Sequence, residues 1–296
     1  MENKCGLIAI VGRPNVGKST MLNQILKQKI SITSRKPQTT RYQIIGIHTE
    51  GDSQIVFVDT PGWQISPKNR LNRLMNREVK QALSDVDLVL MLCDSRQWTL
   101  GDEKIATLVH ESGVPAILAL NKIDLLKNKN SLLPTIAKIS ENYPNFSEFI
   151  PVCAQTVSGV EALLEFIMFS LPERPFIFPK GQVTDRPERF LCGEIIREKT
   201  MNYLGDELPY TTTVVIDDFE ELETITNIIA TIWVGRDSQK PIVIGKNGSL
   251  LKRIASDARF DIEELLQRKV FMKVWVKTKR GWLDSTEAMK TIGLLG

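Results

Sequence analysis

The segment Gly12–Thr20 has a spacing of glycine, lysine and serine that can bind phosphate. Glycines let backbone amides turn toward phosphate oxygens, and a helix that starts after them directs its positive end at the same anion. Lys18 would contact the β and γ phosphates, and the Ser19 hydroxyl would bind magnesium. The predicted nucleotide-binding loop consists of Gly12, Arg13, Pro14, Asn15, Val16, Gly17, Lys18, Ser19 and Thr20.

A second motif, Asp59-Thr60-Pro61-Gly62, lies about 40 residues further along the chain. Asp59 can hold magnesium through water, and the amide of Gly62 can sense the γ phosphate. Asp-x-x-Gly by itself is a weak signal, since it is also a common turn. Its place after an apolar run favours the magnesium interpretation.

A third motif, Asn121-Lys122-Ile123-Asp124, can read the base. Asp124 can accept two hydrogen bonds from the N1 and N2 donors of guanine, which adenine lacks, and a site built this way rejects the wrong base. The stem of Lys122 can lie over the ring, and Asn121 can brace the phosphate loop. The three motifs in this order predict binding of GTP and GDP, with Mg²⁺.

These motifs need a scaffold that brings them together. Short apolar runs alternate with amphipathic helical stretches, such as 73–83 and 103–110, which predicts a doubly wound α/β domain with its ligand beyond the carboxyl ends of the strands. The runs that we expect to be strands are 7–11, 55–58, 88–93, 116–120 and 149–153.

The pattern changes after Leu171. Residues 172–187 contain four prolines and predict a semi-rigid linker between domains 1–171 and 188–296. The second domain is expected to be α+β, in the order helix, strand, strand, helix, strand. Its predicted elements are 188–204, 211–219, 224–234, 249–266 and 270–277, with the β-branched run 242–244 before the second helix.

The chain resembles the Era family of translation-factor-like GTPases. The resemblance rests on Gly12–Ser19, on Gln38-Thr39-Thr40-Arg41, on the two motifs above, and on Ile45-Gly-Ile-His-Thr-Glu. It implies a P-loop GTPase domain followed by a type II KH domain, and slow hydrolysis of GTP.

The resemblance also implies roles for single residues. Thr40 would bind magnesium alongside Ser19 and Asp59, with Thr39 as the close competitor, and Lys18, Thr40 and Gly62 would serve catalysis. The backbone of Ala154 would meet the guanine, although Cys153 replaces the usual serine. Trp63 stands where many GTPases carry a glutamine that orients water, and an indole cannot act as a base. Asn15 resembles the asparagine that holds K⁺ in some relatives.

The second domain carries a candidate RNA site. A Gly-x-x-Gly loop lets a nucleic-acid backbone approach closely, as in KH domains, although a tight turn is the common alternative. Cations gather in 236–253 and 268–280, and acids in 206–223. Ile242 and Val243 would line the base-binding groove together with Ile244. The residues predicted to bind RNA are Ile244, Gly245, Lys246, Asn247, Gly248 and Arg253.

Composition and charge limit where the protein could act and with which partners. The chain has 296 residues, 42% of them hydrophobic, and a net charge of +3. No run reaches the roughly 20 apolar residues of a transmembrane helix, so we expect a cytoplasmic protein. We also expect it to be a monomer. The family resemblance implies the small ribosomal subunit and the 3′ end of its RNA as partners. The alternative is a membrane-associated signalling GTPase, in peripheral contact with the inner face of the cell membrane. The tail 282–296 would close over the RNA or cap the domain.

Overall fold

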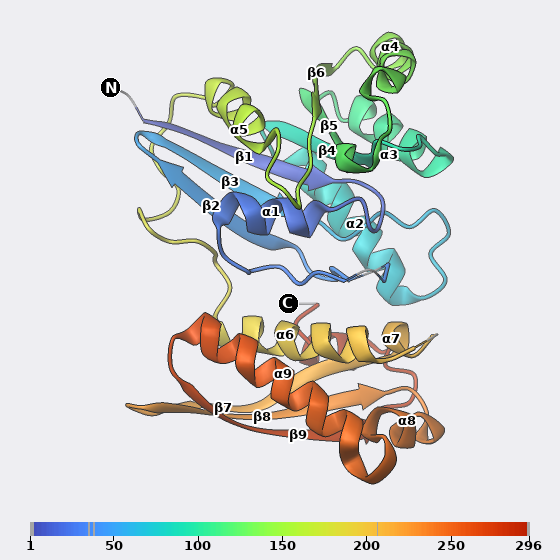
Figure 1. Ribbon diagram of the computed structural model, residues 1–296, viewed down its shortest axis with the longest axis vertical. Helices are drawn as coiled ribbons and strands as arrows, with labels where there is room; N and C mark the ends of the chain where they lie inside the picture. Colours follow the sequence, from blue (N-terminus) through green and yellow to red (C-terminus); the bar gives the residue numbers. More distant parts are fainter. Residues whose placement is uncertain (1–2, 35, 38, 206, 295–296) are drawn as a thin grey trace. The chain divides into compact units, whose positions relative to one another are not determined.

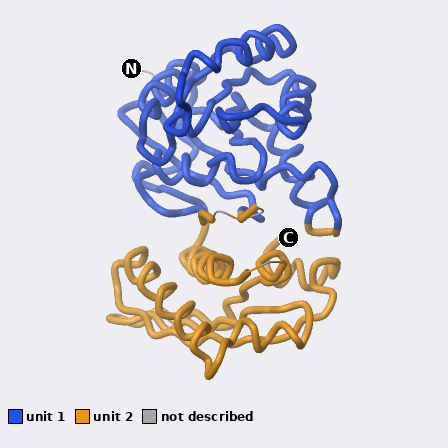
Figure 2. Tube along the Cα trace, turned by 45° about the vertical axis from the view of Figure 1, so that its right-hand side comes forward, with its two compact units in different colours: residues 1–31, 40–68, 72–185 blue, residues 32–39, 69–71, 186–296 orange. Residues whose placement is uncertain are grey.

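The computed structural model describes residues 3–34, 36–37, 39–205 and 207–294. Gln38, Asp206 and Gly296, which the sequence analysis includes, lie outside the described residues. The chain divides into two compact units (Figure 2). The first comprises residues 1–31, 40–68 and 72–185, and the second comprises residues 32–39, 69–71 and 186–296.

The described part of the first unit contains a six-stranded sheet in the order β2-β3-β1-β4-β5-β6 (Figure 1). Neighbouring strands are parallel, except β2 and β3, which pair antiparallel. The strands are β1 (Lys4–Val11), β2 (Ile44–Glu50), β3 (Ser53–Asp59), β4 (Leu88–Asp94), β5 (Ala116–Asn121) and β6 (Phe146–Pro151). The longer helices are α1 (Lys18–Leu26), α2 (Arg70–Ser84), α3 (Leu100–Glu111), α4 (Leu133–Asn142) and α5 (Val160–Phe169).

The strands β4 and β5 are apolar up to their last residues, Asp94 and Asn121, because helices cover both faces of the sheet. Every residue of β4 and β5 is buried. Val79 of α2, Ile105 of α3 and Ile139 of α4 join one apolar cluster on one face, and α1 and α5 lie over the other (Figure 1). The carboxyl ends of β1, β3, β4 and β5 therefore meet at one edge, where the three motifs begin.

Two strand predictions need correction. The sequence analysis missed β2, the edge strand that forms a hairpin with β3 through Gly51 and Asp52. Several of its residues are partly exposed, so β2 lacks the continuous apolar run of the central strands. The Glu-Gly-Asp sequence was the available signal for a hairpin turn before β3. The last strand was expected at 149–153, whereas β6 spans Phe146–Pro151.

The proline-rich segment is hydrogen-bonded along the first unit as far as Thr184. The amide of Cys5 donates to the Pro172 carbonyl at 3.1 Å, and that of Ile47 donates to the Val183 carbonyl at 2.8 Å. The Gln54 side chain accepts from the amides of Ile177 and Phe178. The linker 172–187 and the two domain bounds beside it stay predictions.

The second unit places α6 and α9 on one face of a three-stranded sheet, β7-β8-β9 (Figure 1). β7 and β8 are antiparallel, and β8 and β9 are parallel. The predicted fold class, a doubly wound α/β domain followed by a smaller α+β domain, is confirmed. The elements are α6 (Glu188–Tyr203), α7 (Leu208–Thr211), β7 (Thr213–Glu221), β8 (Ile225–Val234), α8 (Lys240–Ile244), α9 (Ser249–Leu266), β9 (Lys269–Thr278) and α10 (Thr286–Thr291).

The β-branched run 242–244 belongs to the short helix α8 and not to extended chain. Pro241 lies in its first turn, where proline is favourable because a backbone amide at this position would have no acceptor within the helix. Val243 is fully buried in the core of the second unit. It cannot contact a base, so its predicted place in an RNA groove is wrong.

The C-terminal tail is packed into the second unit. Trp282 is 1% exposed, and its Nε1 donates to the Thr211 carbonyl at 2.9 Å. Met289 of α10 is also buried. Within the described ranges, no helix has the length and apolar character needed to cross a membrane.

We predict that Trp282→Ala lowers the free energy of unfolding of the second unit by about 3–5 kcal/mol, the usual cost of removing a large buried aromatic. Trp282→Phe keeps most of the packing and loses the hydrogen bond, so about 1 kcal/mol is expected. Hydrogen exchange of the α6 and β8 amides measures both values. Phe260→Ala is the control, since Phe260 is 69% exposed. Unchanged exchange in Trp282→Ala would contradict a capping role of the tail.

Candidate functional site

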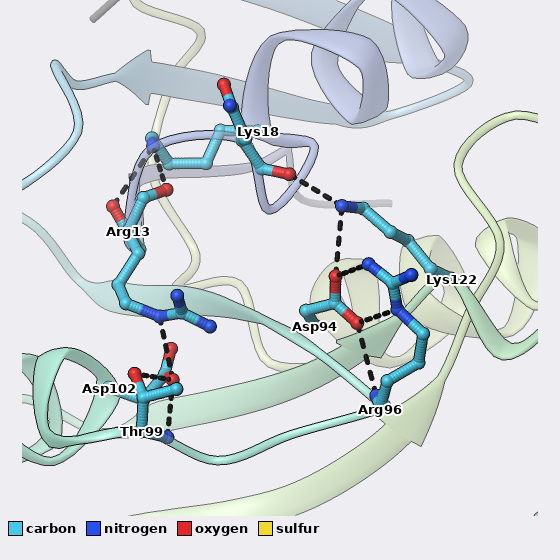
Figure 3. Close-up of polar contacts among 9 residues, drawn as sticks. Arg13, Lys18, Asp94, Arg96, Thr99, Asp102 and Lys122 are labelled. Carbon is cyan, nitrogen blue, oxygen red and sulfur yellow. Dashed lines mark hydrogen bonds and ion pairs between the residues drawn. The ribbon is translucent and has the colours of Figure 1, made fainter. Parts of the chain in front are cut away.

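The loop between β1 and α1 wraps around the Lys18 side chain. Its Nζ donates to the carbonyls of Gly12 and Arg13, both at 3.0 Å (Figure 3). Gly17 has φ +104°, and a Cβ there would lie 2.3 Å from the Asn121 Nδ2. Only glycine therefore fits where the loop passes Asn121.

Burial lowers the pKa of Lys18 to about 8; the Asp59 carboxylate opposes this shift and the nearby Arg13 adds to it. The direction of this shift means that Asp59 and the two carbonyls only partly offset the loss of water around the ammonium group. An anion placed against the ammonium group favours the charged form. The loop is thus arranged to gain from a bound phosphate.

Hydroxyl groups and one carboxylate converge beside Lys18. The Ser19 Oγ lies 2.8 Å from the Thr40 Oγ1 and donates to the Asp59 Oδ2 at 3.0 Å. Ser31, which the sequence analysis missed, donates to the same oxygen at 2.9 Å. The structure brings Thr40 to this cluster, whereas the Thr39 hydroxyl donates to the Lys36 carbonyl at 2.7 Å.

The Asp59 carboxylate is suited to coordinate a cation. It is 0% exposed, and its Oδ1 is buried without a hydrogen-bond partner among the described residues. Burial raises the pKa of Asp59 above its usual value, against the opposing effects of Lys18, Ser31 and Ser19. Oxygen donors of this kind suit a hard cation such as Mg²⁺, and a cation would satisfy the unpaired oxygen.

The segment after β3 is pressed against the phosphate loop. The Thr60 hydroxyl donates to the Ile10 carbonyl at 2.7 Å, and a Cβ on Gly62 would lie 2.9 Å from Pro14. Pro61 is buried beside them. The indole of Trp63 packs against the apolar cluster of the first unit and lines a cavity of about 560 Å³ with Ile65, Leu100 and their neighbours.

The Asn121 side chain ties three loops together. Its Nδ2 donates to the Val16 carbonyl at 2.7 Å, and its Oδ1 accepts from the Lys122 and Ala154 amides at 2.8 and 2.9 Å. The predicted bracing role of Asn121 is therefore visible as a set of hydrogen bonds. Asp124 lies on the following turn, with its side chain exposed.

Lys122 is held by an acid that the sequence analysis missed. Its Nζ donates to the Asn15 carbonyl at 2.7 Å and to the Asp94 Oδ2 at 3.0 Å (Figure 3). Arg96 makes a bidentate pair with Asp94 at 2.9 and 2.7 Å. The hydrogen bonds from Arg96, and then the one from Lys122, hold the pKa of Asp94 well below its usual range, although burial opposes them.

Asp102 anchors the phosphate loop from α3. Its carboxylate is fully buried and lies 2.7 Å from the Arg13 Nε (Figure 3). The same oxygen accepts from the Thr99 amide and hydroxyl at 2.9 and 2.8 Å, which caps the start of α3. One available signal for Asp94 was its position at the carboxyl end of a predicted strand. For Asp102 it was the Thr-x-x-Asp capping pattern.

The Gly-x-x-Gly loop joins α8 to α9 in the second unit. Gly245 and Gly248 have φ +76° and +77°, and Asn247 has φ 53°. Lys246 and Asn247 are exposed, and a Cβ on Gly248 would meet no atom within 4 Å. Ile244 is half-buried, and the Arg253 guanidinium lies over the Tyr203 ring at 4.8 Å.

These features define a class: a P-loop GTPase unit followed by a KH unit. A family model described as a 50S ribosome-binding GTPase matches residues 7–122, and one described as a KH domain matches residues 207–283. Comparison with known proteins narrows the class. The chain is 48% identical to the GTPase Era of Histophilus somni strain 129Pt over 99% of this chain and 98% of that protein.

Other Era proteins are also similar to nearly the whole of this chain. GTPase Era of Vibrio parahaemolyticus is 47% identical, over 99% of this chain and 92% of that protein. Two solved Era structures are each 36% identical, with a TM-score of 0.95, and match 99% of this chain and 100% of theirs. One is a variant of Aquifex aeolicus Era bound to GDP and AlF₄⁻, and the other is Era with MgGDPNP and nucleotides 1506–1542 of 16S ribosomal RNA. The chain belongs to the Era family of GTPases, enzymes that hydrolyse GTP.

We predict that Asp94→Asn weakens GDP binding about tenfold, because Lys122 loses a charged partner and no longer stays fixed beside the base site. Asp94→Glu should restore most of the affinity. Stopped-flow release of a fluorescent GDP analogue measures the effect. Glu103→Gln is the matched control, since Glu103 pairs only loosely with Lys138, at 3.7 Å. Equal release rates of the GDP analogue from Asp94→Asn and the parent protein would contradict a role of Asp94 in nucleotide binding.

Proposed function

We propose that this GTPase is a molecular switch that binds the 3′ end of small-subunit ribosomal RNA and acts in assembly of the small ribosomal subunit. One observation carries the proposal: the same chain joins a nucleotide site to a basic Gly-x-x-Gly loop. The Era structure with a GTP analogue and a 16S RNA fragment, which matches nearly the whole of this chain, supports it.

The proposal assigns the nucleotide to the first unit. The amides of the Gly12–Thr20 loop and Lys18 would hold the phosphates. Ser19, Thr40 and Asp59 would hold Mg²⁺, which supplies charge neutralisation at the phosphates. The amide of Gly62, with Thr60 and Pro61 beside it, would face the γ phosphate. The hydroxyl cluster around Asp59 supports this assignment.

Hydrolysis in this scheme lacks a side-chain base after Gly62. Trp63 offers no proton acceptor and packs on the apolar cluster. Rate enhancement would then come from Lys18, from the backbone amides and from cations, so turnover is slow. We include K⁺ near Asn15 as a second cation in the proposal.

We also propose that Asp124 reads guanine, with Ala154 contributing its backbone. Asp124→Asn should lower GTP affinity at least tenfold and raise affinity for xanthosine triphosphate, because an amide donates where the carboxylate accepts. Equilibrium titration with both nucleotides measures the switch. Asp52→Asn, an exposed acid in the turn before β3, is the control. Unchanged GTP affinity in Asp124→Asn would exclude this base assignment.

The second unit would bind RNA through Ile244, the loop Gly245–Gly248 and Arg253. Gly248 offers a clean test because its Cβ position is open. Asn and Asp have the same shape and both tolerate a positive φ, so Gly248→Asn and Gly248→Asp differ only in charge. We expect Gly248→Asp to weaken binding to small ribosomal subunits at least tenfold more than Gly248→Asn, with GTP hydrolysis in isolation unchanged in both. Equal binding by the two variants would contradict phosphate contact at this loop.

The proposal places the protein in the cytoplasm as a monomer. Basic side chains of the second unit also suit anionic lipid, so peripheral contact with the inner face of the cell membrane is the competing arrangement. Sedimentation with ribosomal subunits or with phosphatidylserine vesicles separates the two. Binding to vesicles alone would favour the signalling alternative.

A further inference from the structure

Strand β9 alternates lysines and aromatic residues on one side. Its other side carries Val270, Met272, Val274 and Val276, which pack into the two apolar clusters of the second unit. Because successive side chains of a strand point to opposite faces, the remaining positions form one row on the face away from α6 and α9. That row is Lys269, Phe271, Lys273, Trp275 and Lys277.

The aromatic side chains of this row are open to solvent. Phe271 is 49% exposed and Trp275 is 56% exposed. Trp233 of β8 pairs in register with Lys277, which makes it the diagonal neighbour of Trp275 on the same face. The Lys273 ammonium lies 5.5 Å from the Phe271 ring centroid, and that of Lys279 lies 5.6 Å from the Trp233 ring centroid.

Charge on this face is divided between its two edges. Asp217 of β7 accepts a hydrogen bond from Thr231, and Glu220 of β7 accepts one from Asn227. β9 forms the opposite edge of the sheet and contains no acid in its ten residues. A polyanion would therefore be drawn along β9 and repelled from β7. We call the face formed by Phe271, Lys273, Trp275, Lys277 and Trp233 the β9 platform.

We propose that the β9 platform is a second RNA-binding surface, on which bases of a single strand stack on Phe271 and Trp275 while Lys273 and Lys277 meet the phosphates. Aromatic faces set between cations fit single-stranded nucleic acid, because every base has a π face and every linkage a negative charge. A second copy of this chain is a poor occupant, since two facing platforms would oppose their lysine rows. The platform is distinct from the Gly245–Gly248 loop. The proposal for the platform therefore holds whether or not that loop binds RNA.

The test is fluorescence anisotropy of the full-length chain with a fluorescein-labelled 12-nucleotide polyadenylate RNA. All variants are measured in the Gly248→Asp background, so that binding at the loop is suppressed. We expect residual RNA binding that falls about fivefold or more in Phe271→Ala/Trp275→Ala, from the stacking lost per base. Phe260→Ala removes an aromatic of α9 that is more exposed than either, and this variant should bind like the background protein.

A second pair of variants tests the phosphate contacts. Lys273→Gln and Lys277→Gln should each reduce the slope of log Kd against log salt concentration by about 0.7, the value for one phosphate contact on a single strand. Far-UV circular dichroism and basal GTP hydrolysis should be unchanged, since all four side chains lie outside the nucleotide site. These lysine variants keep the proposal testable even if the double aromatic variant folds poorly.

Three outcomes would overturn the proposal. One is complete loss of RNA binding in the Gly248→Asp background, which would leave the loop as the RNA site. Another is RNA binding that the aromatic and lysine variants do not change. In the third, the aromatic and lysine variants bind RNA normally but bind phosphatidylserine vesicles more weakly, which would make the platform a lipid contact. Failure of the loop proposal gives a different result, because Gly248→Asp itself would then leave binding intact.

Discussion

The nucleotide site depends on the side-chain amide of Asn121. Its donor end holds the phosphate loop through Val16, and its acceptor end holds the loops that carry Lys122 and Ala154. A carboxamide carries an acceptor oxygen and a donor nitrogen, so one side chain can accept from two loops while it donates to a third. Three segments that are separate in sequence are thereby fixed at the same edge of the sheet, before any ligand contributes energy.

Charge pairs add a second layer of order around this amide. Asp94 fixes Lys122 from the end of β4, and Asp102 fixes Arg13 from the start of α3. Both acids are buried or nearly so, and a buried acid is tolerated only when it is paired. The side chains of Lys122 and Arg13 are thus already oriented by carboxylates that belong to the scaffold, which would limit the reordering needed for binding.

The sequence predicts the parts of this fold that follow from strong local signals. The four buried strands β1, β3, β4 and β5 were predictable because both of their faces are apolar, and the loop Gly12–Thr20 was predictable from its glycine, lysine and serine spacing. Strand β2 was missed because an edge strand carries a mixed pattern. Residues 242–244 were expected only as a β-branched run before the second helix, and the short helix α8 was not predicted because β-branched side chains favour strands.

The supporting residues of the site were less accessible to sequence reasoning. The local pattern does not show that Asp94 will meet Lys122 or that Ser31 will meet Asp59, because each pair is separated by 28 residues along the chain. Such pairings appear only when the sheet order is known. The choice between Thr39 and Thr40 is similar: both carry the same hydroxyl, and only the backbone path decides which one faces Ser19.

The unpaired oxygen of Asp59 also matters for folding. A buried acceptor without a hydrogen-bond partner lowers the stability of the first unit, and a cation bound to this oxygen would offset that cost. By mass action, each tenfold rise in a ligand above its Kd adds about 1.4 kcal/mol to the folded state. With nucleotide and Mg²⁺ bound as proposed, the first unit would therefore resist unfolding and proteolysis most when both are plentiful.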